Sequence, residues 1–269
     1  RDAGTMMDGL SLHYYTSIRS RDKITNGSAT QFDAADWFKT LHKALGIDAY
    51  IVRTKAIMDK YDPQKKVGMV MDEWGTWYDV EPGTNPGFLY QQNTLRDALV
   101  AGVTFNIFHA HADRMHMANI AQTINVLQAM ALTDGAKMLL TPTYHVFEMF
   151  KVHQNATLIP AAVESPAYAM DKNEIPQISA SASKDKAGKV HISLCNLHHE
   201  LGSEVAVELK GISATKVTGR ILTDEKITAH NTFDIPNALK PREFGDAKVE
   251  KGMLTVALLA RSVVVLELA

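Results

Sequence analysis

Two carboxylates and two indole rings lie close together in the segment Met71-Asp72-Glu73-Trp74-Gly75-Thr76-Trp77. The apolar run 67–71 that leads into them is typical of a strand buried on both faces of a parallel sheet. Parallel α/β folds build their sites at the carboxyl ends of such strands. This placement favours a functional role for Asp72 and Glu73, and the alternative is that the pair caps the next element. Trp77 is either a packing residue or a platform for a sugar ring.

A histidine and two tyrosines end another predicted strand, residues 9–14, in the sequence His13-Tyr14-Tyr15. Because side chains alternate along a strand, His13 and Tyr15 share one face. A histidine at the end of a strand can belong to a site, or it can be a structural residue with a satisfied ring. The residues alone leave both interpretations open.

The run His109-Ala110-His111-Ala112-Asp113, followed by His116, has the spacing of a metal site. Residues two apart on a strand project the same way, and imidazole rings favour zinc or iron. A metal-dependent hydrolase is therefore a weaker alternative function. We expect no metal here, because a barrel with a His-x-His strand usually draws further ligands from later strands, and only a short helical layer follows.

Strands and helices that could position these residues alternate in the first half of the chain. Short apolar runs predict strands, and apolar residues spaced three and four apart predict helices. The order strand, helix, strand, helix, strand is that of an α/β fold with right-handed crossovers. The predicted strands are 9–14, 67–71 and 103–108, and the predicted helices are 35–61, 88–101, 117–131 and 144–153.

The chain changes character near residue 158. All three tryptophans precede this point, and short runs of alternating apolar and polar residues follow it. Several short strands separated by turn signals predict an antiparallel β-sandwich, so we expect domains at 1–158 and 159–269. The single cysteine, Cys195, lies in one of these runs and is expected to be a small core residue. The predicted strands include 190–195, 205–209, 253–259 and 262–268.

Composition and charge are those of an ordinary globular protein, with 46% hydrophobic and 22% charged residues, which excludes a disordered or collagen-like chain. The 28 basic and 30 acidic residues leave a net charge of -2, so we expect no nucleic-acid and no membrane partner. No apolar stretch reaches the ~20 residues that span a bilayer. The first residues lack the architecture of a signal peptide, which favours a cytoplasmic location.

Four segments carry a more specific pattern: 71–75 (MDEWG), 85–99 (NPGFLYQQNTLRDAL), 117–127 (MANIAQTINVL) and 140–147 (LTPTYHVF). In sequence and order they closely resemble the α-L-arabinofuranosidases of glycoside hydrolase family 51. The resemblance implies the C-terminal part of a (β/α)8 TIM barrel followed by an antiparallel β-sandwich. It also implies retaining cleavage of terminal L-arabinofuranosyl groups from arabinoxylan, arabinan and their oligosaccharides, without a cofactor.

Site residues follow from the same resemblance, position by position. Glu73 matches the nucleophile at the end of the seventh barrel strand, and Tyr15 matches the tyrosine of the sixth strand that orients it. His13 matches the other member of that sixth-strand pair. Trp77 matches an aromatic wall of the sugar pocket, and Gln122 matches a side chain that binds arabinose hydroxyls.

The general acid/base of the family has no counterpart in this sequence. In the family it is the glutamate of an Asn-Glu pair at the end of the fourth barrel strand, whereas the only Asn-Glu here, 173–174, lies in the second half. Glu148, in a predicted helix after the last strand, is no plausible replacement. We therefore expect a C-terminal fragment with barrel strands six to eight, and the alternative function is a folded fragment without turnover. The missing strands, or other copies of the chain in a homo-oligomer, must then cover the exposed edge.

Overall fold

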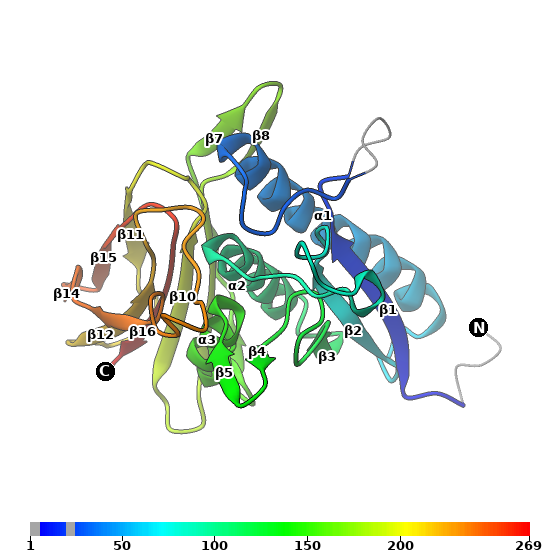
Figure 1. The fold of residues 1–269 in the computed structure, drawn as a ribbon. Coiled ribbons are helices and arrows are strands. Elements are labelled where there is room, and N and C mark those ends of the chain that lie inside the picture. The colour runs from blue at the N-terminus through cyan, green and yellow to red at the C-terminus, as the bar shows by residue number, and fades with distance from the viewer. Residues whose placement is uncertain (1–5, 20–24) are drawn as a thin grey trace.

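The computed structural model describes residues 6–19 and 25–269. Three parallel strands form the centre of its first half (Figure 1). They are β1 (Gly9–Thr16), β2 (Gly68–Thr76) and β3 (Met115–Ile120), hydrogen-bonded in the order β1-β2-β3. The strands predicted at 9–14 and 67–71 are confirmed, and both run further toward their carboxyl ends than the sequence indicates.

Helices α1 (Ala34–Tyr61) and α2 (Leu95–Ala110) pack on this sheet, and α3 (Pro142–Phe150) packs against α2. The Asp33 side chain caps the start of α1, and the helix ends at Tyr61, before Asp62-Pro63, as predicted. Two short 3-10 turns, η1 (Pro86–Phe88) and η2 (Lys151–His153), are the other helical elements among the described residues of this half.

The strand predicted at 103–108 is wrong, because these residues form the second half of α2. The helix is buried along most of its length, so its apolar residues show no helical period. The helix predicted at 88–101 therefore begins and ends too early. The overlooked signal is a capping box, in which the backbone N–H of Thr94 donates to the Asp97 carboxylate at 2.8 Å.

The helix predicted at 117–131 is also wrong. Its first residues belong to β3, and residues 121–130 form an irregular loop that leads into a hairpin. Met117 and Ile124, which were expected on an apolar helix face, are exposed. Apolar spacing by itself did not separate one helix from a short strand followed by a loop. The hairpin strands are β4 (Ala131–Asp134) and β5 (Lys137–Leu140).

From residue 157 onward, two antiparallel sheets share one core and form what we call the two-sheet unit. One sheet has the order β13-β12-β16-β10-β9-β6 and the other the order β11-β15-β14. Apolar side chains of both sheets, such as Ile192, Val264 and Leu254, fill the space between them. The strands are β6 (Thr157–Ile159), β9 (Ile178–Lys184), β10 (Val190–Asn196), β11 (Ser203–Glu208), β12 (Val217–Leu222), β13 (Arg242–Phe244), β14 (Ala247–Glu250), β15 (Met253–Leu258) and β16 (Ser262–Leu268), with a separate hairpin of β7 (Ala167–Met170) and β8 (Asn173–Pro176).

Helix α2 lies between the parallel sheet and the six-stranded sheet (Figure 1). The amide oxygen of Asn106 accepts hydrogen bonds from Ser193 at 2.7 Å and Ser181 at 3.0 Å. A Cβ placed on Gly102 would lie 2.7 Å from the sulfur of Cys195, so only glycine permits this approach. Cys195 is buried, as predicted, and burial raises the pKa of its thiol. Strand β10 is thus buried on both faces.

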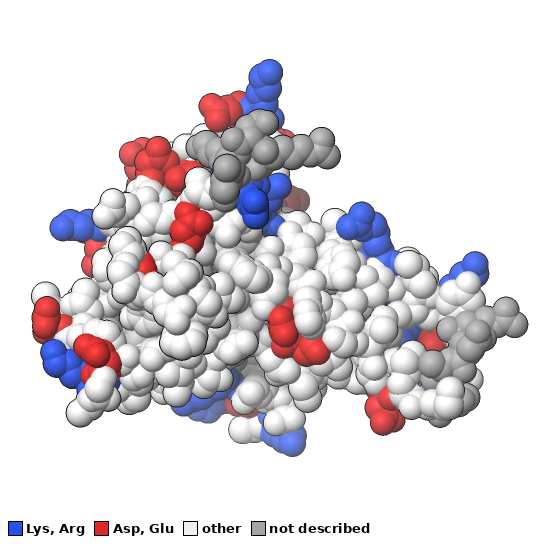
Figure 2. All heavy atoms as spheres, turned by 45° about the vertical axis from the view of Figure 1, so that its right-hand side comes forward, with Lys and Arg blue, Asp and Glu red and all other residues white. Residues whose placement is uncertain are grey.

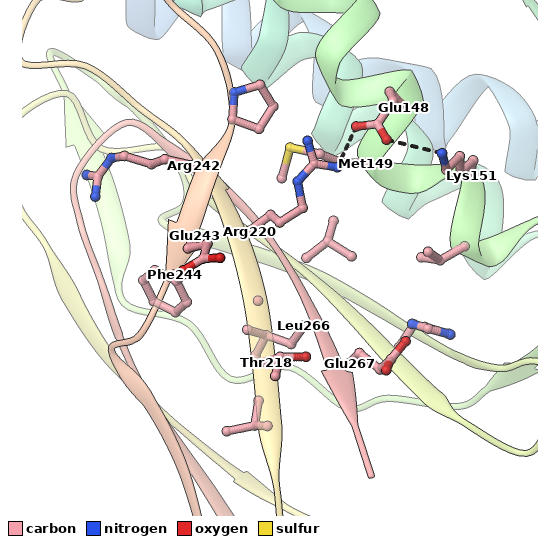
Figure 3. Close-up of a pocket in the computed structure, with 16 residues that line it drawn as sticks. Glu148, Met149, Lys151, Thr218, Arg220, Arg242, Glu243, Phe244, Leu266 and Glu267 are labelled. Carbon is pink, nitrogen blue, oxygen red and sulfur yellow. Dashed lines mark hydrogen bonds and ion pairs between the residues drawn. The ribbon is translucent and has the colours of Figure 1, made fainter.

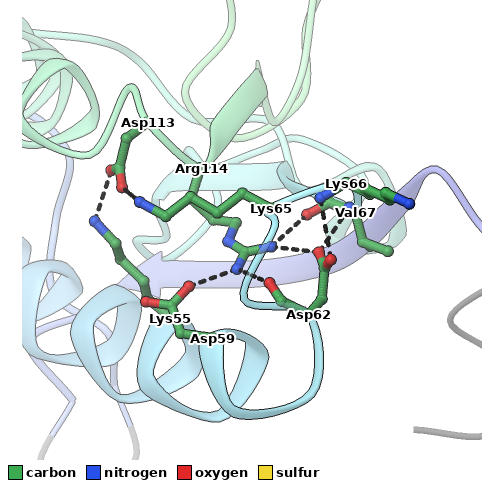
Figure 4. Close-up of polar contacts among 8 residues, drawn as sticks. All are labelled: Lys55, Asp59, Asp62, Lys65, Lys66, Val67, Asp113 and Arg114. Atoms are coloured by element: carbon green, nitrogen blue, oxygen red, sulfur yellow. Dashed lines mark hydrogen bonds and ion pairs between the residues drawn. The ribbon is translucent and has the colours of Figure 1, made fainter.

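The amino ends of β2 and β3 are held by Arg114, whose side chain is fully buried (Figure 4). Its guanidinium donates to the Asp62 carboxylate at 2.7 Å, to the Val67 carbonyl at 3.0 Å and to the Asp59 carboxylate. The backbone N–H of Val67, with further help from Arg114, lowers the pKa of Asp62. Both terminal nitrogens of the guanidinium therefore have hydrogen-bond partners that hold the side chain in place.

Figure 2 shows one face of the molecule, on which acidic and basic side chains are interspersed and lie mostly toward the edges. No field of a single sign covers this face. Within the described ranges, no helix is both long enough and apolar enough to cross a membrane.

Candidate active site

Glu73 and Tyr15 meet at the carboxyl ends of β2 and β1. The Tyr15 hydroxyl donates a hydrogen bond of 2.6 Å to Oε2 of Glu73, whose side chain is 42% exposed. Burial, reinforced by this bond and by the charge of Glu73, raises the pKa of Tyr15. The phenol therefore stays protonated and holds one carboxylate oxygen, while the exposed part of Glu73 remains open to a ligand.

His13 contacts both carboxylates of the pair. Its Nδ1 lies 3.5 Å from Oε2 of Glu73, and its Nε2 lies 3.1 Å from Oδ1 of Asp72. Simple alternation would put Asp72 and Glu73 on opposite faces of β2. The register shifts between Leu12 and His13 of β1, however, so Asp72 is an extra residue opposite this step and both carboxylates reach His13.

Ser11 is a member of this cluster that sequence reasoning missed. Its hydroxyl lies 2.9 and 2.8 Å from the two carboxylate oxygens of Asp72. The same alternation that pairs His13 with Tyr15 also includes position 11, so this signal was present in the sequence.

Trp77 and Gln122 complete the set of predicted site residues at the carboxyl edge of the sheet. The Trp77 ring meets the Tyr15 ring edge to face, with centroids 5.0 Å apart. Gln122 was expected on a helix, but it lies just beyond β3, where the neighbouring Ala121 N–H donates to the Trp74 carbonyl at 2.9 Å. Gln122 therefore follows the strand that pairs with β2, and the end of β3 adjoins the end of β2.

A buried network of polar side chains holds the backbone at the end of β2. Oε1 of Gln128 accepts from the Thr76 N–H at 2.8 Å, and its amide donates to the Asp97 carbonyl at 2.8 Å. The Thr76 hydroxyl donates to the Asp97 carboxylate at 2.6 Å, and burial raises the pKa of Asp97. Gly75 lies between these groups with φ of +141°, a conformation that L side chains rarely adopt. These contacts fix the backbone that carries Glu73.

The His-x-His run does not form a shared site, because it lies at the end of α2 and in the following turn rather than on a strand. His109 contacts the Ser181 hydroxyl at 2.8 Å, and His111 contacts Asp48 at 2.7 Å. Asp113 instead pairs with Lys55 and Lys65 (Figure 4). Among residues 6–19 and 25–269, no group of three or more His, Cys, Asp or Glu side chains is arranged to hold a metal ion.

Glu148 lies in a groove between α3 and the six-stranded sheet (Figure 3). Its carboxylate pairs with Arg220 at 2.5 Å and with Lys151 at 3.1 Å. Burial opposes ionisation, but the two cations outweigh it and lower the pKa of Glu148. An ionised carboxylate in two ion pairs has no proton to donate, so Glu148 is not suited to act as a general acid.

Residues 72–262 match the α-L-arabinofuranosidase C-terminal domain family. The chain belongs to this family. It is 48% identical over 98% of its length to the intracellular exo-α-L-arabinofuranosidase of Bacteroides ovatus, and this match covers 51% of that enzyme. It is 27% identical over 80% of its length to the exo-α-(1→6)-L-arabinofuranosidase of Bifidobacterium longum, covering 43% of that enzyme.

The crystal structure of the GH51 arabinofuranosidase from Xanthomonas axonopodis pv. citri superposes with a TM-score of 0.96 at 50% identity. The superposition covers 99% of this chain and 54% of that one. The chain thus corresponds to the C-terminal portion of a family 51 α-L-arabinofuranosidase and spans about half the length of the relatives it matches. The arabinofuranosidase family consists of glycoside hydrolases, which canonically use a pair of Asp or Glu carboxyl groups.

Proposed function

We propose that this chain supplies the nucleophile half of a retaining α-L-arabinofuranosidase. The enzyme would release terminal L-arabinofuranosyl groups from arabinoxylan, arabinan and their oligosaccharides. The observation that supports this proposal most directly is the half-exposed Glu73 carboxylate, which the Tyr15 hydroxyl holds at 2.6 Å.

In the proposed mechanism, the free oxygen of Glu73 attacks the anomeric carbon of the arabinosyl group while the glycosidic C–O bond breaks. The leaving oxygen takes a proton from a general acid, and a covalent arabinosyl-enzyme results. Water activated by the same residue, now acting as a base, then attacks the anomeric carbon and regenerates Glu73. Tyr15 keeps the Glu73 carboxylate aligned in both steps, because a neutral donor holds one oxygen without neutralising the charge.

His13, Trp77 and Gln122 would bind the sugar. Gln122 offers an amide for arabinose hydroxyls, and Trp77 offers an apolar face for the C–H side of the ring. Asp72 is already engaged by Ser11 and His13 and would orient the histidine. We propose that the acid/base is supplied by residues outside this chain, which agrees with the half-length match to the relatives.

The same proposal extends to the architecture and the compartment. The parallel sheet with its helices would be strands six to eight of a (β/α)8 barrel, and the two-sheet unit would be a β-sandwich domain, with the boundary near residue 158. The relative from Bacteroides ovatus is named an intracellular enzyme, which supports a cytoplasmic location.

The test is Glu73→Ala in the complete enzyme, assayed with 4-nitrophenyl α-L-arabinofuranoside. Loss of a nucleophile should lower kcat by about 10³-fold or more. Azide should restore turnover, because it occupies the vacated space and yields an arabinosyl azide. The matched control is Glu148→Gln, which should keep near-normal turnover. Normal activity of Glu73→Ala would remove Glu73 from the mechanism.

A folded fragment without turnover is the second candidate, favoured by the lack of a matched acid/base. It predicts that the 269-residue chain alone has no enzymatic rate even on the aryl arabinoside, although the leaving group of this substrate needs little protonation. Turnover within about tenfold of a full-length relative would show that the chain completes its own site.

A further inference from the structure

The connection between β12 and β13, residues 223–241, is long and irregular. Connections of more than about 12–15 residues without a helix or strand are uncommon and usually have a function. This one reaches from the two-sheet unit to the parallel half, because the Ala229 carbonyl accepts a hydrogen bond of 2.8 Å from the N–H of Leu95, the first residue of α2. We call residues 229–233 the support segment.

Asn231 fixes the shape of the support segment. Its side-chain amide donates to the Leu239 carbonyl at 3.0 Å, and its side-chain oxygen accepts from the Leu239 N–H at 2.7 Å, which closes residues 231–239 into a loop. The same amide donates to the carbonyl of Leu140, the last residue of β5, at 2.8 Å. Asn231 is 0% exposed within this chain alone, so these bonds do not depend on the other half of the complete enzyme.

The support segment holds the chain that returns from the loop after β2. The Asn231 carbonyl accepts a hydrogen bond of 3.1 Å from the side-chain amide of Gln92. On either side of this bond, Phe233 and Tyr90 pack against one small hydrophobic core at the hairpin of β4 and β5, and Leu95 binds residue 229. Residues 90–95, which we call the returning chain, are therefore attached to the two-sheet unit at three points.

The returning chain in turn holds the start of the same loop, where Trp77 lies. The fully buried Gln91 binds both neighbours of Trp77 in the sequence: its side-chain oxygen accepts from the Tyr78 N–H at 2.8 Å, and its amide donates to the Thr76 hydroxyl at 3.2 Å. The Trp77 N–H itself donates to the Thr16 carbonyl at the end of β1, at 2.9 Å. The backbone at Trp77 is thus held by β1 and by the returning chain, which is held by the support segment.

We propose that Asn231 of the two-sheet unit is a positioning residue, which acts through Gln92 and Gln91 on the orientation of the Trp77 ring. A ring that packs on a sugar must keep its distance and tilt, and a misplacement of about 1 Å caused by a distant mutation can cost up to about 100-fold in rate. The inference rests on the proposed function, because the role of Trp77 in the sugar pocket comes from it. It assigns the two-sheet unit a part in substrate affinity.

The test is Asn231→Ala in the complete enzyme, assayed with 4-nitrophenyl α-L-arabinofuranoside. Trp77 would contact the sugar equally in the ground state and the transition state, so KM should rise about three- to tenfold while kcat stays within about twofold. The matched control is Asn196→Ala, since the Asn196 amide is also buried and donates to two carbonyls, those of Leu201 and Leu259, at 2.9 and 3.0 Å. Both variants should lower the urea midpoint, and only Asn231→Ala should raise KM.

A double-mutant cycle tests the route from Asn231 to Trp77. With Trp77→Ala already present, Asn231→Ala should raise KM by less than about twofold, because the ring on which Asn231 acts is gone. Gln92→Met keeps the length of the side chain and removes its bond to Asn231, so it should reproduce part of the rise in KM. Gln92→Met decides the question if Asn231→Ala does not fold.

The other outcomes each overturn the inference. If the unchanged complete enzyme does not cleave the aryl arabinoside, the proposed function fails and the inference fails with it. If it does, and KM is unchanged in Asn231→Ala, or in Gln92→Met where only that variant folds, the function stands and the positioning role is overturned. An equal rise of KM in Asn196→Ala would show a general loosening of the fold instead. Additive effects of Asn231→Ala and Trp77→Ala would show that Asn231 does not act through Trp77.

Discussion

The two ends of the parallel sheet both gather carboxylates, yet they treat them differently. At the amino ends, Asp59 and Asp62 are bound by the buried guanidinium of Arg114. At the carboxyl ends, Glu73 and Asp72 are held only by neutral hydroxyls and an imidazole, and Glu73 remains 42% exposed.

This difference separates a group that holds the fold from one that is free to react. A carboxylate neutralised by a buried cation is a poor nucleophile, and removing such carboxylates leaves the buried charge of Arg114 unpaired. A carboxylate oriented by a phenol keeps its charge and one open oxygen. The ion pairs at the amino ends should therefore contribute to the free energy of unfolding, and the contacts at the carboxyl ends should contribute to kcat.

The largest expected effect is on stability. Arg114→Ala should lower the free energy of unfolding by about 3 kcal/mol or more, because the buried guanidinium donates to the Val67 and Asp62 carbonyls and a hydrogen bond to a charged group contributes about 1.5–3 kcal/mol. Urea denaturation of the complete enzyme measures this loss. The kcat of the folded fraction should be unchanged, and a loss of kcat without a loss of stability would break the division between the two ends.

Tyr15→Phe should show the opposite pattern. Removing one hydrogen bond to a charged group costs about 1.5–3 kcal/mol, so kcat should fall about ten- to a hundredfold. The urea midpoint should change little, because Tyr15 lies at the open end of β1. Tyr14→Phe is the matched control; its hydroxyl donates to the Lys43 carbonyl of α1, away from Glu73. Unaltered kcat in Tyr15→Phe would show that the bond to Glu73 has no catalytic role.

A pH effect is expected where α2 meets the two-sheet unit. Burial lowers the pKa of His109 to about 4, and its ring lies 4.7 Å from that of His153, whose pKa is lowered to about 3. Both rings are neutral when folded but gain protons on unfolding below pH ~6.5, so stability should fall as pH drops from there toward 4. Each histidine contributes at most about 1.4 kcal/mol per pH unit. Thermal unfolding of His109→Asn between pH 6.5 and 5 should show a shallower decline, and an identical slope would contradict the assignment.

The smallest effect is expected at Asp113, which is 41% exposed. Burial opposes ionisation there, but Lys55 and Lys65 lower the pKa of Asp113 to about 2. Its contribution is therefore present above pH ~4 and lost as pH falls toward 2. Asp113→Asn should cost less than about 1 kcal/mol at pH 7 in urea denaturation, because exposed ion pairs contribute little. A loss comparable to that of Arg114→Ala would remove the distinction between exposed and buried pairs.

The sequence predicted the strands that carry Glu73 and Tyr15, because alternation and buried apolar runs are local properties. It also placed His13 and Tyr15 on one face, which the contacts of both with Glu73 confirm. It failed for α2, since burial on all sides removes helical periodicity. The contact of Asp72 with His13 depends on a shift of register between two strands. Such contacts between distant parts of the chain give no pattern in the local sequence from which they could be predicted.

The packing of α2 against the two-sheet unit, which includes the contact of Gly102 with Cys195, has a consequence for synthesis of the protein on the ribosome. Helix α2 ends at Ala110, but β16, one of the strands that cover it, begins only at Ser262. At about 5–20 residues per second, the helix would wait on the order of 8–30 seconds for that cover. Strands β9 and β10 emerge earlier and cover part of its outer apolar side, but the part that β16 covers has no partner during this interval, and an unpartnered apolar surface attracts chaperones or other nascent chains. Slow translation through residues 111–261 should therefore reduce the yield of folded protein more than slow translation before α2.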